Sequence, residues 1–394
     1  MKQNDLPWTV PASAIWTLVI FAAAGPLLAA PVLNNVNGAM DHKGTITISG
    51  SGFGSKATAA PLVWDDATAS NLLKTWSGAW PNALPGYNTD YYSPMRDISP
   101  PHSHDTRYIA GAHAGVCCTN GAYTGGNVLV FKVTSLPSFP GYIYASWYQR
   151  ADHEWVFGRD NNLKTFDYSL GGNPYASGND PKNPYKMNSW YTAYGPPHPG
   201  SSTDTGTQWV IEGGPGALSN PDANGHNAWW GSAVNPMAGK WSKVQIAFKV
   251  TDQSDGYVNV WENGHQVVGY AGPTDTYPGT QRTITIGGFA RIRSPNNWVY
   301  FDDVYVDTTL SRVVLADKPV LSQATIIENQ IPSAWSDSSI TATVNLGQFT
   351  QGQTAYLFVV DSSGTPSAKG FVVTVGGTAA GGTTPNAPSS VAVH

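Results

Sequence analysis

Apolar and polar residues alternate with a period of two along most of this chain, a pattern that predicts strands. In Gly44–Lys56, Ile46 and Ile48 alternate with threonines and a serine, and a run of serines and glycines then ends the strand. No long stretch follows the 3.6-residue period of an amphipathic helix. Because a single strand is unstable in water, this one needs partners elsewhere in the chain.

Further strand candidates follow at regular intervals between Pro61 and Asp307. They are Asn127–Val133, Tyr142–Arg150, Asn162–Leu170, Thr207–Gly213, Trp241–Val250, Gly256–Gly264, Arg282–Ile292 and Asn297–Asp307. About eight to twelve such strands around one core make a two-sheet sandwich. The longest expected loop is Gly171–Gly206, and a loop of that length inside a compact domain is often functional.

Composition supports an extracellular all-β protein of two or three domains. Charged residues make up only 12% of the 394-residue chain, while 42 glycines and 29 prolines imply many turns. The net charge of -5 comes without a basic patch, which argues against a nucleic-acid partner.

The N-terminal residues 1–30 resemble a secretory signal. The apolar run Ala14–Ala30 ends in small residues, which predicts cleavage near Ala29 or Ala30. The alternative is an uncleaved membrane anchor, and no later stretch is apolar enough to cross a bilayer. We therefore expect a secreted or cell-surface protein with no membrane span after cleavage.

The two cysteines are adjacent, so they cannot form a disulfide framework. Cys117 and Cys118 are either a strained vicinal disulfide or two thiols, and a metal site built on this pair alone is weakly supported.

The segment Trp241–Val268 combines a strand, a short turn, a second strand and an Asn263-Gly264 hairpin, and Tyr300–Val306 reads YFDDVYV. Both resemble the concanavalin A-like lectin/glucanase jelly roll, a fold shared with polysaccharide lyases. The resemblance implies a two-sheet sandwich over roughly Pro61–Asp307. It leaves the activity open, because this fold carries lectins, hydrolases, lyases and adhesion modules.

Gly44–Gly54, Trp335–Val344 and Tyr356–Val375 together resemble an IPT/TIG domain, an immunoglobulin-like sandwich. We therefore predict that a jelly roll (59–315) is inserted between the first strands (31–58) and the remainder (316–376) of this smaller domain, with a flexible tail at 377–394. This insertion requires Pro61–Asp66 to pair beside the last jelly-roll strand. The alternative is a lone N-terminal strand followed by a complete C-terminal domain.

Candidate catalytic residues fit a polysaccharide lyase better than a glycoside hydrolase. Paired carboxylates at hydrolase spacing are missing, as is a Glu-x-Asp-x-x-Glu strand. A lyase needs a cation to neutralise the uronate carboxylate, and a Tyr or His to move protons. The candidates are Tyr148, Arg150, His153 and Lys164. Tyr144, Ser146, Tyr148 and Arg150 share one face of their strand; ordinary strand packing is the alternative reading.

Aromatic residues outside the expected strands are candidates for sugar stacking. The predicted ligand-binding residues are Tyr144, Tyr168, Trp190, Tyr191, Trp229, Trp230, Arg291 and Arg293. Trp190 and the pair Trp229-Trp230 are expected in loops. By contrast, Trp147, Trp209, Trp241 and Trp261 are expected in the core.

A structural calcium ion is a further expectation from the resemblance. Its ligands would be Asp65 or Asp66 together with Asp302 or Asp303 and backbone carbonyls, because all-oxygen sets suit Ca²⁺. For His102, His104 and Asp105, a polar loop is the simpler reading than a zinc site.

The sequence thus favours a secreted or surface glycan-binding or adhesion protein whose partner is a polysaccharide or surface glycan. A lyase acting on an anionic glycan is the alternative, and a structural surface module is a second one. Whether the protein is an enzyme stays open at this stage.

Overall fold

The computed structural model describes residues 29–66, 76–77, 101–104, 109–111, 126–127, 130–136, 141–151, 162–170, 189–194, 207–212, 227–232, 239–251, 253–272, 274, 282–286, 289–291 and 299–379. Within these ranges the secondary structure is strand apart from a short 3-10 helix, η2 (Leu321–Gln323). The predicted all-β class is confirmed. Among the described residues, no helix is long and apolar enough to cross a membrane.

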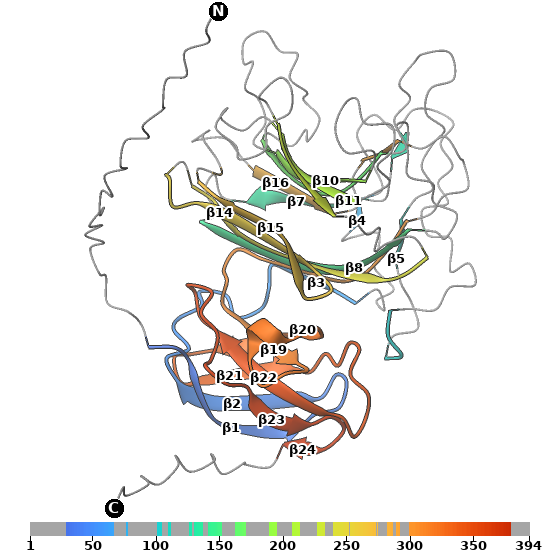
Figure 1. Cartoon of the computed structure of the whole chain (residues 1–394). Coiled ribbons are helices and arrows are strands. Elements are labelled where there is room, and N and C mark those ends of the chain that lie inside the picture. The colour runs from blue at the N-terminus through green and yellow to red at the C-terminus, as the bar shows by residue number, and fades with distance from the viewer. Residues whose placement is uncertain are drawn as a thin grey trace, which may run out of the picture.

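Two antiparallel sheets form the larger sandwich (Figure 1). The seven-stranded sheet runs in the order β15 (His265–Ala271), β14 (Tyr257–Glu262), β13 (Ser242–Lys249), β8 (Tyr142–Ala151), β18 (Val299–Asp307) and β3 (Val63–Asp65), with β5 (Ile109–Gly111) also on β18. The nine-stranded sheet runs β12 (Asn227–Ser232), β11 (Thr207–Glu212), β10 (Ser189–Tyr194), β9 (Asn162–Leu170), β16 (Arg282–Ile286), β7 (Val130–Leu136) and β4 (Trp76–Ser77), with β17 (Phe289–Arg291) and β6 (Gly126–Asn127) off this path.

Alternation along β8 separates the interior of this sandwich from its outer face. Trp147 is fully buried and stacks on Phe166 of the nine-stranded sheet, with 5.7 Å between ring centroids. The intervening positions Tyr144 and Tyr148 lie on the opposite face, which packs toward the second, smaller sandwich. In Figure 1 the seven-stranded sheet is therefore the middle layer of the molecule.

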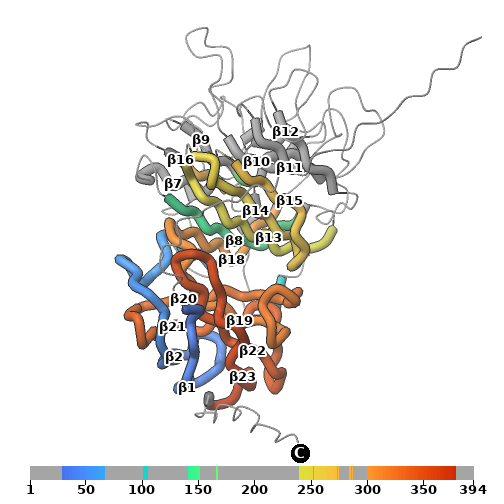
Figure 2. The backbone as a smooth tube through the Cα atoms, turned by 60° about the vertical axis from the view of Figure 1, so that its left-hand side comes forward, coloured from blue at the N-terminus to red at the C-terminus, as the bar shows by residue number. Residues whose placement is uncertain are grey.

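The smaller sandwich is one folded-over sheet drawn from both ends of the chain. Its strand order is β23 (Phe371–Thr374), β22 (Thr354–Val360), β19 (Arg312–Ala316), β20 (Ile327–Trp335), β21 (Ser339–Thr343), β2 (Thr45–Ser51), β1 (Val32–Ala39) and β24 (Thr378–Ala379). Figure 2 shows β1 and β2 beside the C-terminal strands.

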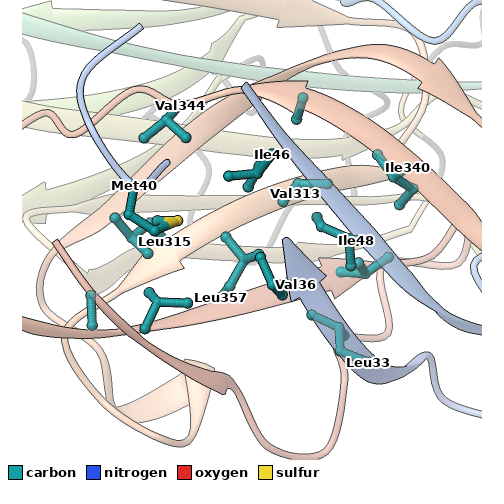
Figure 3. Close-up of a cluster of buried hydrophobic side chains, with 14 of the residues drawn as sticks. Leu33, Val36, Met40, Ile46, Ile48, Val313, Leu315, Ile340, Val344 and Leu357 are labelled. Carbon is teal, nitrogen blue, oxygen red and sulfur yellow. The ribbon is translucent and has the colours of Figure 1, made fainter. Parts of the chain in front are cut away.

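Strand β2, predicted from Ile46 and Ile48, pairs with β21, nearly three hundred residues downstream. Ile48 of β2 is level with Ile340 of β21, and both are fully buried. Val313 and Leu357 from β19 and β22 complete the same core (Figure 3). The alternative of a lone N-terminal strand is therefore wrong. The chain leaves this sandwich after β2 and returns to it at β19, and β3 pairs with β18 as the insertion requires.

The hairpin predicted at Asn263-Gly264 is present between β14 and β15. Both residues have positive φ values, 50° and 78°, as a two-residue hairpin turn of this kind requires.

Two expectations about loops are wrong. Trp190 and Tyr191 lie on β10, and Trp229 and Trp230 lie on β12. Both segments are rich in aromatic residues and pair through all six residues with β11, so tertiary pairing outweighs the turn-rich sequence around them.

Candidate functional site

A cleft of about 590 Å³ lies between the outer face of the seven-stranded sheet and the smaller sandwich. We call it the junction cleft. Tyr144, Gln245, Tyr257, Asn259 and Trp261 line it from the sheet, and Leu310, Arg312 and Ser363 are among the residues that line it from the smaller sandwich.

Strand alternation on β14 directs one row of side chains into the junction cleft. Val258 and Val260 are buried in the larger sandwich, whereas Tyr257, Asn259 and Trp261 are only partly buried. The described residues offer no hydrogen-bond partner to the Trp261 indole N–H or the Tyr257 hydroxyl. Asn259 uses its oxygen to accept from Gln266 at 3.1 Å. The row therefore presents two aromatic faces with unused polar groups beside them.

Arg312 of β19 enters the cleft from the opposite wall. Its guanidinium lies 4.1 Å above the Tyr144 ring, and Nη1 donates to the Leu310 carbonyl at 2.8 Å. In the described part of the chain no carboxylate is within ion-pair distance, and the buried Nε lacks a hydrogen-bond acceptor. A ring and a carbonyl thus hold this cation in place without neutralising it.

Beside the cleft, a buried polar group of four residues joins the two sandwiches; we call it the junction network. Glu328 of β20 is fully buried and accepts from the Tyr148 hydroxyl and, at 2.7 Å, from Lys243 Nζ. Gln348 donates to Tyr148 Oη at 3.0 Å and, through its backbone, to Glu328 at 3.2 Å. Lys243 also lies 4.1 Å from the Tyr148 ring centroid.

This environment fixes the protonation of Tyr148. Burial raises the pKa of its hydroxyl well above its usual range, and the charge of Glu328 adds to the effect. Tyr148 therefore stays protonated and serves as a hydrogen-bond donor between the sandwiches.

A second buried pair, His102 and Asp303, adds to the contact between the two sandwiches. His102 Nε2 donates to Asp303 Oδ2 at 3.0 Å, and the Asn345 amide donates to the same oxygen at 3.3 Å. Burial opposes ionisation of Asp303, but the bond to His102 and the charges of His102 and Lys243 outweigh it, so the pKa of this carboxyl is lowered. The network and this pair tie β8, β13 and β18 to the smaller sandwich.

The structure brings some predicted site residues together and separates others. Tyr144 and Tyr148 share a face as expected, but Tyr144 lines the cleft while Tyr148 is only 1% exposed and closed off by Glu328. The Tyr148 hydroxyl is thus engaged by Glu328 and Gln348 and has little contact with solvent. Arg150 follows on the same strand. His153 and Arg293 lie outside the described residues.

The remaining candidates lie on the nine-stranded sheet. Strand register sets Tyr168 of β9 opposite Trp190 and Lys164 opposite Ala193. Trp229 and Trp230 are opposite Val210 and Trp209. Arg291 of β17 is opposite Asn162.

The four aspartates proposed for calcium lie on or next to the paired strands β3 and β18. Asp65 is opposite Val304. Asp66 forms an ion pair with Lys43 at 3.3 Å, Asp303 bonds His102, and Asp302 Oδ1 accepts the Asp303 backbone N–H at 2.8 Å. These carboxylates therefore already have partners within the protein. The described residues include no cluster of three or more His, Cys, Asp or Glu with the geometry of a metal site. Calcium binding stays a prediction from the resemblance.

Two residues that dominate the cleft, Trp261 and Arg312, are not among the site residues predicted from the sequence. Trp261 was expected in the core with Trp147, which is buried, but it is partly exposed in the cleft. The strand pattern contained the signal, because Val258 and Val260 alternate with Tyr257, Asn259 and Trp261. Arg312 carried no comparable signal, since its position depends on the smaller sandwich.

Comparisons with known proteins give structural likeness only. No family model matches the sequence, and none of the curated proteins matches it. Among solved structures, the alginate lyase Aly36B is similar at 14% identity over 67% of this chain and 96% of that chain, with a TM-score of 0.40. An endo-β-1,4-glucuronan lyase from the fungus Trichoderma reesei is similar at 12% identity over 64% and 96%, with a TM-score of 0.38. The cellulose induced protein Cip1 is similar at 16% identity over 63% and 97%, also with a TM-score of 0.38. Likeness at this level leaves the activity to be argued from the residues of this chain.

Proposed function

We propose that this protein binds a carbohydrate chain and that the junction cleft is a binding site for it. The observation that carries the proposal is the row Tyr257, Asn259 and Trp261 on one wall of the cleft. Aromatic faces stack on the apolar faces of sugar rings, and amides bond the hydroxyls. Along a strand, Tyr257 and Trp261 are about 13 Å apart, which is more than the width of a single hexose ring.

Affinity electrophoresis through gels containing neutral and acidic polysaccharides tests this proposal. We expect the wild-type protein to be retarded by at least one glycan and Trp261→Ala to lose most of that retardation. Trp64→Ala is the matched control, because Trp64 is a partly buried tryptophan of the same sheet that does not line the cleft. Equal retardation of wild type and Trp261→Ala would contradict the proposal.

A second candidate function is β-elimination on an anionic glycan by the nine-stranded sheet. Its support is the strand register, which puts Lys164 and Tyr168 on β9 and Arg291 on the adjacent strand β17, opposite Asn162. In such a reaction a cation neutralises the uronate carboxylate, and a tyrosine moves the proton at C5. Incubation with uronate polysaccharides should produce an ultraviolet-absorbing unsaturated product that Tyr168→Phe no longer forms. Product formation unchanged in that variant would reject this assignment.

The identity of the smaller sandwich belongs to the same proposal. Its interrupted strand order and the motifs at Gly44–Gly54 and Trp335–Val344 support an IPT/TIG-type domain divided by the larger sandwich, with boundaries at residues 31–58 and 316–376. Such a domain would serve as a spacer on a secreted protein, a localisation that still depends on the signal-like N-terminus.

A further inference from the structure

We infer that the junction cleft selects acidic sugars and that Arg312 is the residue that binds their carboxylate. The inference rests on the proposed carbohydrate function and adds a ligand class to it. Its starting point is a cation in the wall of a cleft without a carboxylate partner in the described part of the chain.

The surroundings of Arg312 make it a fixed donor. Stacking on Tyr144 at 4.1 Å and the bond from Nη1 to the Leu310 carbonyl restrict the guanidinium to one orientation. Among the described residues, none accepts a hydrogen bond from Nη2, so this edge of the guanidinium is available to a ligand. A guanidinium with a pre-set orientation loses less entropy on binding a carboxylate than a free surface cation does.

The charge balance of the cleft favours an anion. Among the described residues that line it, Arg312 and His265 are the basic side chains, and none is an aspartate or a glutamate. Two neighbouring carboxylates have cationic partners, because Lys56 is 2.6 Å from Asp307 and Lys243 is 2.7 Å from Glu328. A third, Asp361, accepts hydrogen bonds from Ser363 and Thr365. Among the described lining residues, Arg312 is therefore a cation available to a ligand.

The aromatic row and the cation would divide recognition between them. Tyr257 and Trp261 would stack on sugar rings whether or not the sugar is charged. Arg312, on the facing wall, would distinguish a uronate from the corresponding neutral sugar, because charge-assisted bonds to carboxylates are stronger than neutral ones. Removing Arg312 should abolish the discrimination and leave stacking in place.

Isothermal titration calorimetry with a uronate oligosaccharide and its carboxyl-reduced form tests whether Arg312 recognises the sugar carboxylate. We expect the wild-type protein to prefer the acidic oligomer about 10- to 100-fold, and Arg312→Gln to bind both forms about equally. Arg312→Lys should recover only part of the preference, because lysine lacks the planar fork. Lys369→Gln, which removes an exposed positive charge outside the cleft, should bind as wild type does.

Two results would overturn the inference in different ways. Equal wild-type affinity for both oligomers, or an unchanged preference in Arg312→Gln, would refute the role of Arg312 and leave carbohydrate binding intact. Absence of wild-type binding to either oligomer, or to any glycan in the electrophoresis panel, would refute the proposed function and this inference with it.

Discussion

Lys243 and Glu328 form a buried ion pair, and at the scale of single residues such pairs are costly to break. Lys243 is 6% exposed and Glu328 is fully buried, so either charge left alone has little access to water. The pair connects β13 of the larger sandwich to β20 of the smaller one. The ion pair therefore stabilises the contact between the two sandwiches.

We predict that Lys243→Met lowers the free energy of unfolding by about 3–5 kcal/mol, because Glu328 keeps a buried charge without its main cation. The double variant Lys243→Met with Glu328→Gln should cost clearly less, since the amide retains an oxygen for Tyr148 and Gln348 and carries no charge. Urea denaturation of the single and double variants measures the coupling. Strictly additive costs would show that the two residues do not interact.

Asp303 should make the protein less stable in acid. The folded state lowers the pKa of this carboxyl, so its contribution to stability is fully present above the unfolded-state pKa and is lost as the pH falls through the folded-state pKa. His102→Gln removes a charge that lowers this pKa, and the acid-unfolding transition should then move to higher pH. His265→Gln, at an exposed histidine, is the control and should leave the transition unchanged. Circular dichroism during acid titration measures the pH of this transition. The same transition pH in His102→Gln and wild type would refute the role of the His102–Asp303 pair in acid stability.

At the scale of elements, the turn that follows β21 positions the junction network. Gly347 has a φ of 49°, and a Cβ at this position would collide with the Glu328 carboxylate. Gly352 also has a positive φ, 82°, but a Cβ there would meet nothing within 4 Å. The two glycines share a backbone requirement and differ in the space around them.

We therefore expect Gly347→Ala to cost more stability than Gly352→Ala. The second variant should lose about 1–2 kcal/mol from left-handed backbone strain alone, and the first should lose that amount plus the displacement of Glu328. Thermal unfolding of both variants compares them directly. Equal losses would mean that Glu328 moves aside without cost.

The elements also show which features the sequence could predict. Strands with strict alternation, such as Tyr257–Glu262, and the Asn263-Gly264 hairpin were predictable because the signal lies within a few residues. Strands β10 and β12 were not, because their order comes from pairing with β11 amid turn-rich sequence. Side-chain alternation placed Tyr144 and Tyr148 on one face, but which structure covers that face is a tertiary property.

At the scale of the whole molecule, the smaller sandwich needs strands from both ends of the chain, and this limits which truncated chains can fold. β2 lies between β1 and β21. The N-terminal segment contributes Val36, Ile46 and Ile48 to the core of the smaller sandwich. The motifs that resemble IPT/TIG strands pointed to this pairing. The junction cleft, however, depends on how the two sandwiches pack, and no local pattern in the sequence encodes that.

We predict that a chain lacking residues 29–58 fails to form the smaller sandwich, because the deletion removes two paired strands and a large part of one core. Full-length Ile48→Ala is the milder test and should lose about 2–5 kcal/mol. Limited proteolysis should cleave the truncated chain rapidly between residues 316 and 376. Equal protease resistance in that region before and after truncation would contradict the shared core.

The most direct test of the account is oxidative footprinting of the tryptophans with and without a bound oligosaccharide. We predict that the ligand protects Trp261, on the wall of the junction cleft, and leaves Trp64, on the same sheet outside the cleft, as reactive as before. Protection confined to Trp190, Trp229 and Trp230, with Trp261 still fully reactive, would place the carbohydrate on the nine-stranded sheet and contradict the account.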